Sequence, residues 1–214
     1  MNWNIIYLFV ASFLISFIGT LPLGPINLSV VETTLKEGRR AASFLSLAAS
    51  ILEMGQVFIA LYCSWWFADL LSYSDWTKWA AVLLFILIGL FFWLKKEKKK
   101  DQKVQRVNEK GAFLKGVVLG ILNPQAVPFW FFVLSSLNST DVLNLNFQDN
   151  VFLIFLFLLA AGIGKFASLS LFAAISKLVE KQAAKYSEYL NKIIGGVLIG
   201  IGLIQAIGLF FKSS

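Results

Sequence analysis

Three ionisable side chains lie within long apolar stretches of the sequence, and they are the first candidates for chemistry. Glu53 and Lys165 each fall near the middle of such a stretch, and Glu32 falls near the end of another. A charge at the centre of a bilayer costs at least about 2.5–3.5 kcal/mol, so such residues usually face the protein interior and pair. We therefore predict an ion pair between Glu53 and Lys165. Glu32 is either an entrance residue or an ordinary interfacial charge.

Glu53 is also the candidate for carrying a proton. The chain has no histidine and a single cysteine, Cys63, which excludes histidine relays, histidine ligands and disulfides. A buried carboxylate is then the available group for proton transfer. The alternative is a static pair with Lys165 that only fixes the register of two helices. The sequence contains no cluster of Cys, His or Asp residues and no Walker pattern. We therefore expect no metal site and no cofactor.

The prolines mark the second set of candidates. The four prolines form two pairs, Pro22 with Pro25 and Pro124 with Pro128, and both pairs fall inside apolar stretches. Proline removes a backbone hydrogen bond and breaks a helix. Irregular backbone at membrane depth is tolerated where it is buried or lines a cavity. The alternative is a simple kink in packed helices. The predicted substrate-binding residues are those at the two breaks, with two further side chains: Pro22, Gly24, Pro25, Asn27, Asn123, Pro124, Gln125, Trp130 and Lys165.

The composition shows which elements must position these residues. Hydrophobic residues make up 58% of the 214 residues and charged residues only 14%, against about 45–50% and about 25% in soluble domains. The mean hydropathy is +0.75. These values exclude a water-soluble globule, a disordered chain and, despite a net charge of +7, a nucleic-acid binder. They predict an all-α integral membrane protein.

About 20 mostly apolar residues are needed for a helix to cross the membrane. The sequence predicts six such helices: about 3–31, 43–68, 77–94, 113–137, 150–176 and 190–211. Of the nineteen lysines and arginines, sixteen follow the first, third and fifth predicted spans. The positive-inside rule then places those loops in the cytoplasm and both termini outside it. A compact multi-pass chain of this kind suits a bacterial inner membrane.

The six predicted spans divide into two halves of three. Because three is odd, the halves cross the membrane in opposite senses, and the first helix of each half is the one broken at proline. We therefore predict one membrane domain, 1–214, built as an inverted repeat: repeat 1 at about 1–94, a basic cytoplasmic loop at about 95–112 and repeat 2 at about 113–214. Paired broken helices in two halves are typical of secondary transporters. Small residues four apart at Gly116 and Gly120 predict close helix packing, and Gly162 and Gly164 allow close approach beside Lys165.

Several short motifs together resemble the LysE-type amino-acid exporter family. These are Gly24-Pro25-x-Asn27, Glu37-Gly38-Arg39-Arg40, an acid in the second span at Glu53, and Leu122-Asn123-Pro124. The resemblance covers essentially the full length. It implies export of amino acids such as lysine, arginine, homoserine, threonine or leucine. The chain departs from the family pattern at Leu23, at Glu53 in place of an aspartate, and at Gln125 in place of a lysine.

The preferred interpretation is a secondary transporter that exports amino acids or similar small zwitterions in exchange for protons, and not an enzyme. Its expected partners are the amino acid, protons and the lipid bilayer, with a homo-oligomer possible and no nucleic acid. One alternative is an ion or metal exporter, although a single buried acid offers few ligands for an ion. Another is a membrane scaffold or accessory protein, which has no need of matched helix breaks.

Overall fold

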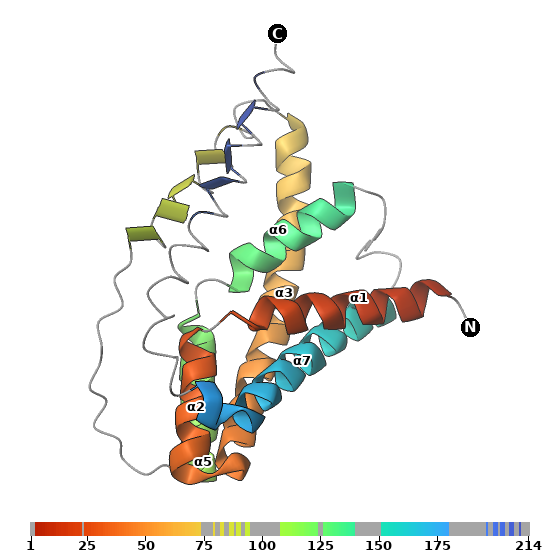
Figure 1. Ribbon diagram of the computed structural model, residues 1–214. Helices are drawn as coiled ribbons and strands as arrows, with labels where there is room; N and C mark the ends of the chain where they lie inside the picture. Colours follow the sequence, from red (N-terminus) through yellow and green to blue (C-terminus); the bar gives the residue numbers. More distant parts are fainter. Residues whose placement is uncertain are drawn as a thin grey trace. The chain divides into compact units, whose positions relative to one another are not determined.

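The computed structural model describes residues 3–22, 24–73, 108–123, 126–139 and 151–179, with isolated helical positions between 79 and 94 and between 196 and 210. Every element in these residues is an α-helix (Figure 1). The helices are α1 (Trp3–Thr20), α2 (Pro25–Glu37), α3 (Arg39–Tyr73), α5 (Glu109–Ile121), α6 (Ala126–Ser139) and α7 (Val151–Ala174).

The chain forms two compact units. The first unit combines Met1–Ser64 with Val104–Gln182, and the second combines Trp65–Lys103 with Ala183–Ser214. In the second unit, a Cβ atom on Gly202 would lie 2.8 Å from Ile86 Cγ1, so the segments around these two residues pack closely. Most of the predicted spans 77–94 and 190–211, and most of the loop 95–112, lie outside the described residues.

Two of the described helices are long and apolar enough to cross a membrane unaided. They are the Arg39–Ser64 part of α3 and the whole of α7. The helices α1 and α2 together make a third candidate, if the bent pair is counted as one span. The described residues are therefore all-helical, as predicted, and contain two or three candidate membrane spans, whereas six spans arranged as an inverted repeat stay a prediction.

The first predicted helix break lies between α1 and α2, which meet at an angle of 77°. Pro25 is the first residue of α2, where its missing N–H has no helical partner to lose. The side chain of Asn27 stabilises the break, since its Nδ2 donates to the Thr20 carbonyl at 2.6 Å and to the Pro22 carbonyl at 3.0 Å. Carbonyl groups at the end of α1 thus gain a donor that the helix itself does not supply.

The predicted span 113–137 is likewise divided in two. Helix α5 has 13 residues and α6 has 14, about 20 Å each, so neither crosses the roughly 30 Å of hydrocarbon alone. Of the two prolines expected to interrupt this span, Pro128 lies in the first turn of α6. A first-turn N–H has no partner in the helix, so proline does not break it there. Pro124 and Gln125 lie outside the described residues.

Glycines bring the helices of the first unit into close contact. Added Cβ atoms at Gly116 and Gly120 on α5 would collide with α3, the first with the Leu45 carbonyl and with Ala48 Cβ at 2.9 Å. On α7, a Cβ at Gly162 would lie 2.8 Å from Met54 on α3, and one at Gly164 would collide with the Phe13 carbonyl of α1. The predicted close packing at these four glycines is therefore confirmed.

The helices α1 and α7 lie side by side in Figure 1, and α2 packs against both α7 and α5. An apolar core joins α1, α3, α6 and α7; its buried members are Leu8, Val57, Ala60, Leu61, Trp130, Leu134, Phe157 and Ala161. Between α2 and α3, Gly38 adopts a φ of 91°, a backbone conformation that favours glycine. The chain can therefore end α2 at Glu37 and begin α3 at Arg39.

Candidate functional site

A buried ion pair between Glu53 and Lys165 lies at the centre of the first unit. Lys165 Nζ, on α7, contacts Glu53 Oε2, on α3. Their side chains are only 3% and 6% exposed, respectively. The pairing predicted from the sequence is therefore present. Because both residues lie in the two helices that can span a membrane unaided, the pair keeps two opposite charges inside the membrane-spanning part of the protein.

Two neutral donors complete the surroundings of the Glu53 carboxylate. Ser16 Oγ donates to Glu53 Oε1 at 2.8 Å, and Trp130 Nε1 donates to the same oxygen at 3.2 Å. Ser16 comes from α1 and Trp130 from α6, so four helices converge on one carboxylate. A buried charge needs this degree of pairing, because an uncompensated one is strongly unfavourable.

Small residues allow α1 to reach the site. Gly164 precedes Lys165 and lets the backbone of α1 approach α7 at Phe13. One turn earlier on α1, Ser12 Oγ donates to the Phe157 carbonyl of α7 at 2.7 Å. These contacts hold Ser16 at the level of the ion pair. A side chain at residue 164 would therefore separate α1 from α7 and displace Ser16 from Glu53.

Trp130 is the largest fully buried side chain among the described residues. Its indole ring packs edge-to-face on Phe157, with centroids 5.7 Å apart and an interplanar angle of 75°. The indole N–H requires an acceptor when it is buried, and Glu53 provides one. The ring of Trp130 therefore lies directly against the acid, whereas its role in lining a cavity stays a prediction.

A row of buried polar side chains runs along α3 on both sides of the acid. Ser46, Ser50, Glu53 and Gln56 are all buried and are spaced three or four residues apart, which places them on one helix face. Ser46 and Ser50 bond back to carbonyls of their own helix. Gln56 Nε2 instead donates to the Gly120 carbonyl near the end of α5, at 2.8 Å. The polar face of α3 therefore extends from the ion pair to the second helix break.

Ser168 lies on α7 one turn beyond Lys165 and is fully buried. Its hydroxyl has no hydrogen-bond partner among the residues that the structure describes. A buried hydroxyl without a partner is unusual, and an unobserved ligand or water is a common explanation. Ser168 is therefore a free donor on the same face of α7 as the site lysine.

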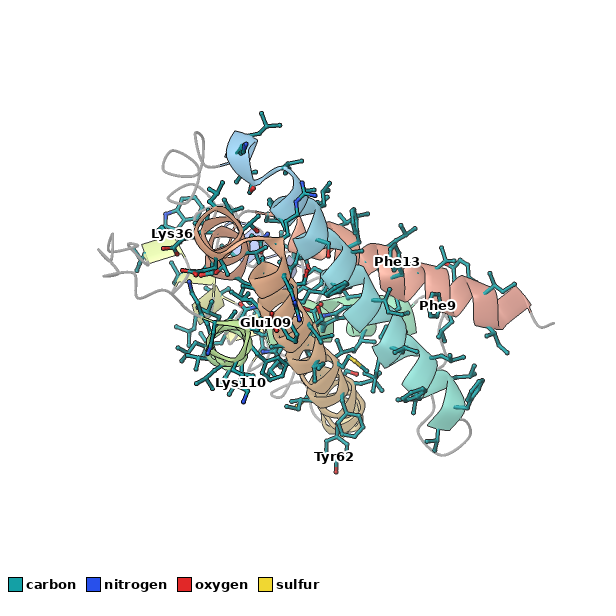
Figure 2. The ribbon with its side chains drawn as sticks, turned by 90° about the horizontal axis from the view of Figure 1, so that it is seen from below. Phe9, Phe13, Lys36, Tyr62, Glu109 and Lys110 are labelled. Carbon is teal, nitrogen blue, oxygen red and sulfur yellow. The ribbon has the colours of Figure 1, made fainter. Side chains whose placement is uncertain are left out.

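A second group of charges lies near the ends of α2 and α5. Glu32 on α2 pairs with Lys36 of the same helix at 2.9 Å and with Lys115 of α5 at 3.4 Å. Arg40 Nε, at the start of α3, pairs with Glu109 at 2.8 Å; Lys36 and Glu109 are labelled in Figure 2. These side chains are substantially exposed. Glu32 is thus paired with Lys36 and Lys115 and not with Glu53, and both interpretations, an entrance residue or an interfacial charge, stay predictions.

The structure brings together three of the predicted site residues, Glu53, Lys165 and Trp130. Pro22, Gly24, Pro25 and Asn27 lie at the first break, and the amide nitrogen of Asn27 donates to the carbonyls of Thr20, the last residue of α1, and of Pro22 beyond it. Asn123 follows α5, and its backbone N–H donates to the Gly120 carbonyl at 3.2 Å. A role of these break residues in binding stays a prediction, as it does for Pro124 and Gln125.

Ser16, Gln56 and Ser168 are candidate site residues that the sequence analysis missed. The signal for two of them was a helical spacing of polar residues within an apolar span: Ser12 with Ser16, and Gln56 with Glu53. In the described part of the chain, no group of three Cys, Asp or Glu side chains is arranged to hold a metal ion.

Comparison with known proteins provides the remaining finding. Residues 17–208 match a protein-family model described as LysE type translocator. No curated protein and no solved structure matches the chain.

Proposed function

The chain belongs to the LysE type translocator family, and from this premise we propose that it is a secondary active transporter that exports amino acids or related small zwitterions. We place it in the bacterial inner membrane, with protons as the coupling ion. The family is one of transporters and not of enzymes.

The observation that supports this proposal best is the pair of opposite charges buried among α1, α3, α6 and α7. A zwitterionic amino acid contains the same two charges, an ammonium and a carboxylate. When it binds, its ammonium replaces Lys165 as the partner of Glu53, and its carboxylate replaces Glu53 as the partner of Lys165. Each buried charge then stays paired, so binding does not leave an unpaired charge in the membrane.

Polar groups around the pair supply the directional contacts. Ser16 Oγ and Trp130 Nε1 hold the Glu53 carboxylate in place while its second oxygen receives the substrate ammonium. The unpartnered Ser168 hydroxyl, one turn from Lys165, donates to the substrate carboxylate. The free N–H groups at the start of α2 and the carbonyls before the breaks are further candidate ligands for the carboxylate and the ammonium.

Proton coupling follows from the chemistry of Glu53. As a carboxylate it binds the substrate ammonium; once protonated on the outer side it is neutral and no longer retains a cation. The substrate then leaves, and the proton is carried inward as the transporter returns. This inward movement of protons allows the proton gradient to drive export.

The test is amino-acid release from dipeptide-loaded cells that express the protein, with mass spectrometry of the medium. We expect expression to accelerate the release of one chemical class of amino acid. Glu53→Gln should abolish release driven by the pH gradient while the protein stays in the membrane. The matched control is Glu32→Gln, which removes a carboxylate of the same kind that is itself 30% exposed and pairs with the partly exposed Lys36 and Lys115. Full activity of Glu53→Gln would refute the role of Glu53 as the proton carrier.

A further inference from the structure

We propose that this transporter selects substrates by net charge and that it carries zwitterions of net charge zero in preference to basic or acidic amino acids. The inference rests on the proposed export function and specifies its substrate class. It starts from the electrical balance of the site. Among the buried residues that the structure describes, Glu53 and Lys165 are the only charged ones, and they neutralise each other.

The other groups at the site are polar but uncharged. The donors next to the carboxylate are the hydroxyl of Ser16 and the indole N–H of Trp130. One turn from the lysine on α7 is the hydroxyl of Ser168, which has no partner among the described residues. These groups orient a ligand through hydrogen bonds. None of them compensates a further positive or negative charge.

The other ion pairs among the described residues of the first unit do not supply the missing charge either. Glu32 is bound to Lys36 and Lys115, and Arg40 is bound to Glu109. These side chains are partly or largely exposed, in contrast to the 3% and 6% exposure of the site pair. Their charges are screened by solvent and paired with each other.

A substrate of net charge zero therefore pairs every charge in the loaded site. Lysine or arginine would add an unpaired positive side chain, and glutamate or aspartate an unpaired negative one. The insertion cost of one charge at the bilayer centre converts to a preference on the order of 100-fold for the neutral class.

The same reasoning predicts how substitutions change the preference. Lys165→Met gives the site a net charge of −1, which should favour lysine and arginine. Glu53→Gln gives a net charge of +1, which should favour glutamate and aspartate. The double variant E53Q/K165M restores a net charge of zero. Its preference should return to the neutral class although it retains neither charged residue.

The experiment is counterflow of radiolabelled amino acids into vesicles that contain the purified full-length protein. Three pools are compared: alanine, leucine and threonine; lysine and arginine; glutamate and aspartate. The pH is equal on both sides, so that transport does not depend on proton coupling through Glu53. The expected result is a wild-type protein that prefers the neutral pool by about 100-fold. The preferred pool should be lysine and arginine for Lys165→Met and glutamate and aspartate for Glu53→Gln. The double variant should again prefer the neutral pool.

Each contrary outcome has a distinct meaning. Wild-type transport of lysine or glutamate at rates near those of the neutral pool would overturn the charge-selection proposal, even if no variant folds. Variants that lose activity equally towards all three pools would also overturn it, since a purely structural pair predicts that result. Both outcomes leave amino-acid transport intact. Absence of counterflow for every pool by the correctly folded wild-type protein would instead refute the proposed function.

Discussion

Breaking the buried pair one residue at a time should destabilise the protein far more than removing both charges together. Lys165→Met leaves a carboxylate that is about 6% exposed with only two neutral donors, Ser16 and Trp130. Glu53→Gln leaves the ammonium of Lys165, about 3% exposed, facing an uncharged amide. Loss of one member of a buried ion pair costs about 3–5 kcal/mol, so the two single changes sum to about 6–10 kcal/mol.

The double variant should cost much less than that sum. In E53Q/K165M, the amide oxygen at residue 53 still accepts from Ser16 and Trp130, while the new NH2 group, in the place of Oε2, has no acceptor. One unsatisfied buried polar group costs about 1–3 kcal/mol. The expected coupling energy between the two positions is therefore at least about 3 kcal/mol.

The assay is thermal unfolding of the purified protein in detergent, followed by tryptophan fluorescence. At about 2–4 °C per kcal/mol for a chain of this length, each single variant should unfold about 6–20 °C below the wild type. The double variant should unfold at a higher temperature than at least one of the single variants. The reasoning would be refuted if the two single effects simply added in the double variant, because the side chains would then not interact.

Two further predictions concern the packing and the free hydroxyl. Gly116→Val should lower the unfolding midpoint by the equivalent of about 1–3 kcal/mol or more, because its Cβ collides with the Leu45 carbonyl. The matched control Gly55→Val should cost little stability, because nothing lies within 4 Å of a Cβ at residue 55. Equal effects of the two substitutions would contradict the close contact at Gly116. Ser168→Ala should leave the unfolding midpoint unchanged or slightly higher, since its hydroxyl has no partner among the described residues to lose. The same substitution should raise the KM for export about tenfold, because the substrate carboxylate loses a donor. An unchanged KM would show that Ser168 is not part of the binding site.

Much of the site could be predicted before the structure, because membranes impose strict rules on sequence. A buried acid and a buried base in otherwise apolar spans must find each other, and Glu53 and Lys165 do. Prolines inside apolar runs interrupt helices or lie in a first turn, as Pro128 does in α6. One interruption falls at Pro22 to Pro25 and the other between Ile121 and Ala126. Small residues four apart favour close packing, and Gly116 and Gly120 meet α3.

The sequence by itself therefore determined the class of protein, the helical character of the chain, the position of the first break and the two charged residues of the site. Each of these depends on local chemistry, such as hydrophobicity, proline geometry or the cost of a buried charge. Tertiary structure decided the rest. Three features depend on how α1, α2, α6 and α7 are rotated about their axes. Ser16 and Trp130 bind the same oxygen of Glu53, and Asn27 holds the first break. Ser168 has no partner among the described residues. Those rotations result from the combined packing of many side chains, which no single motif encodes.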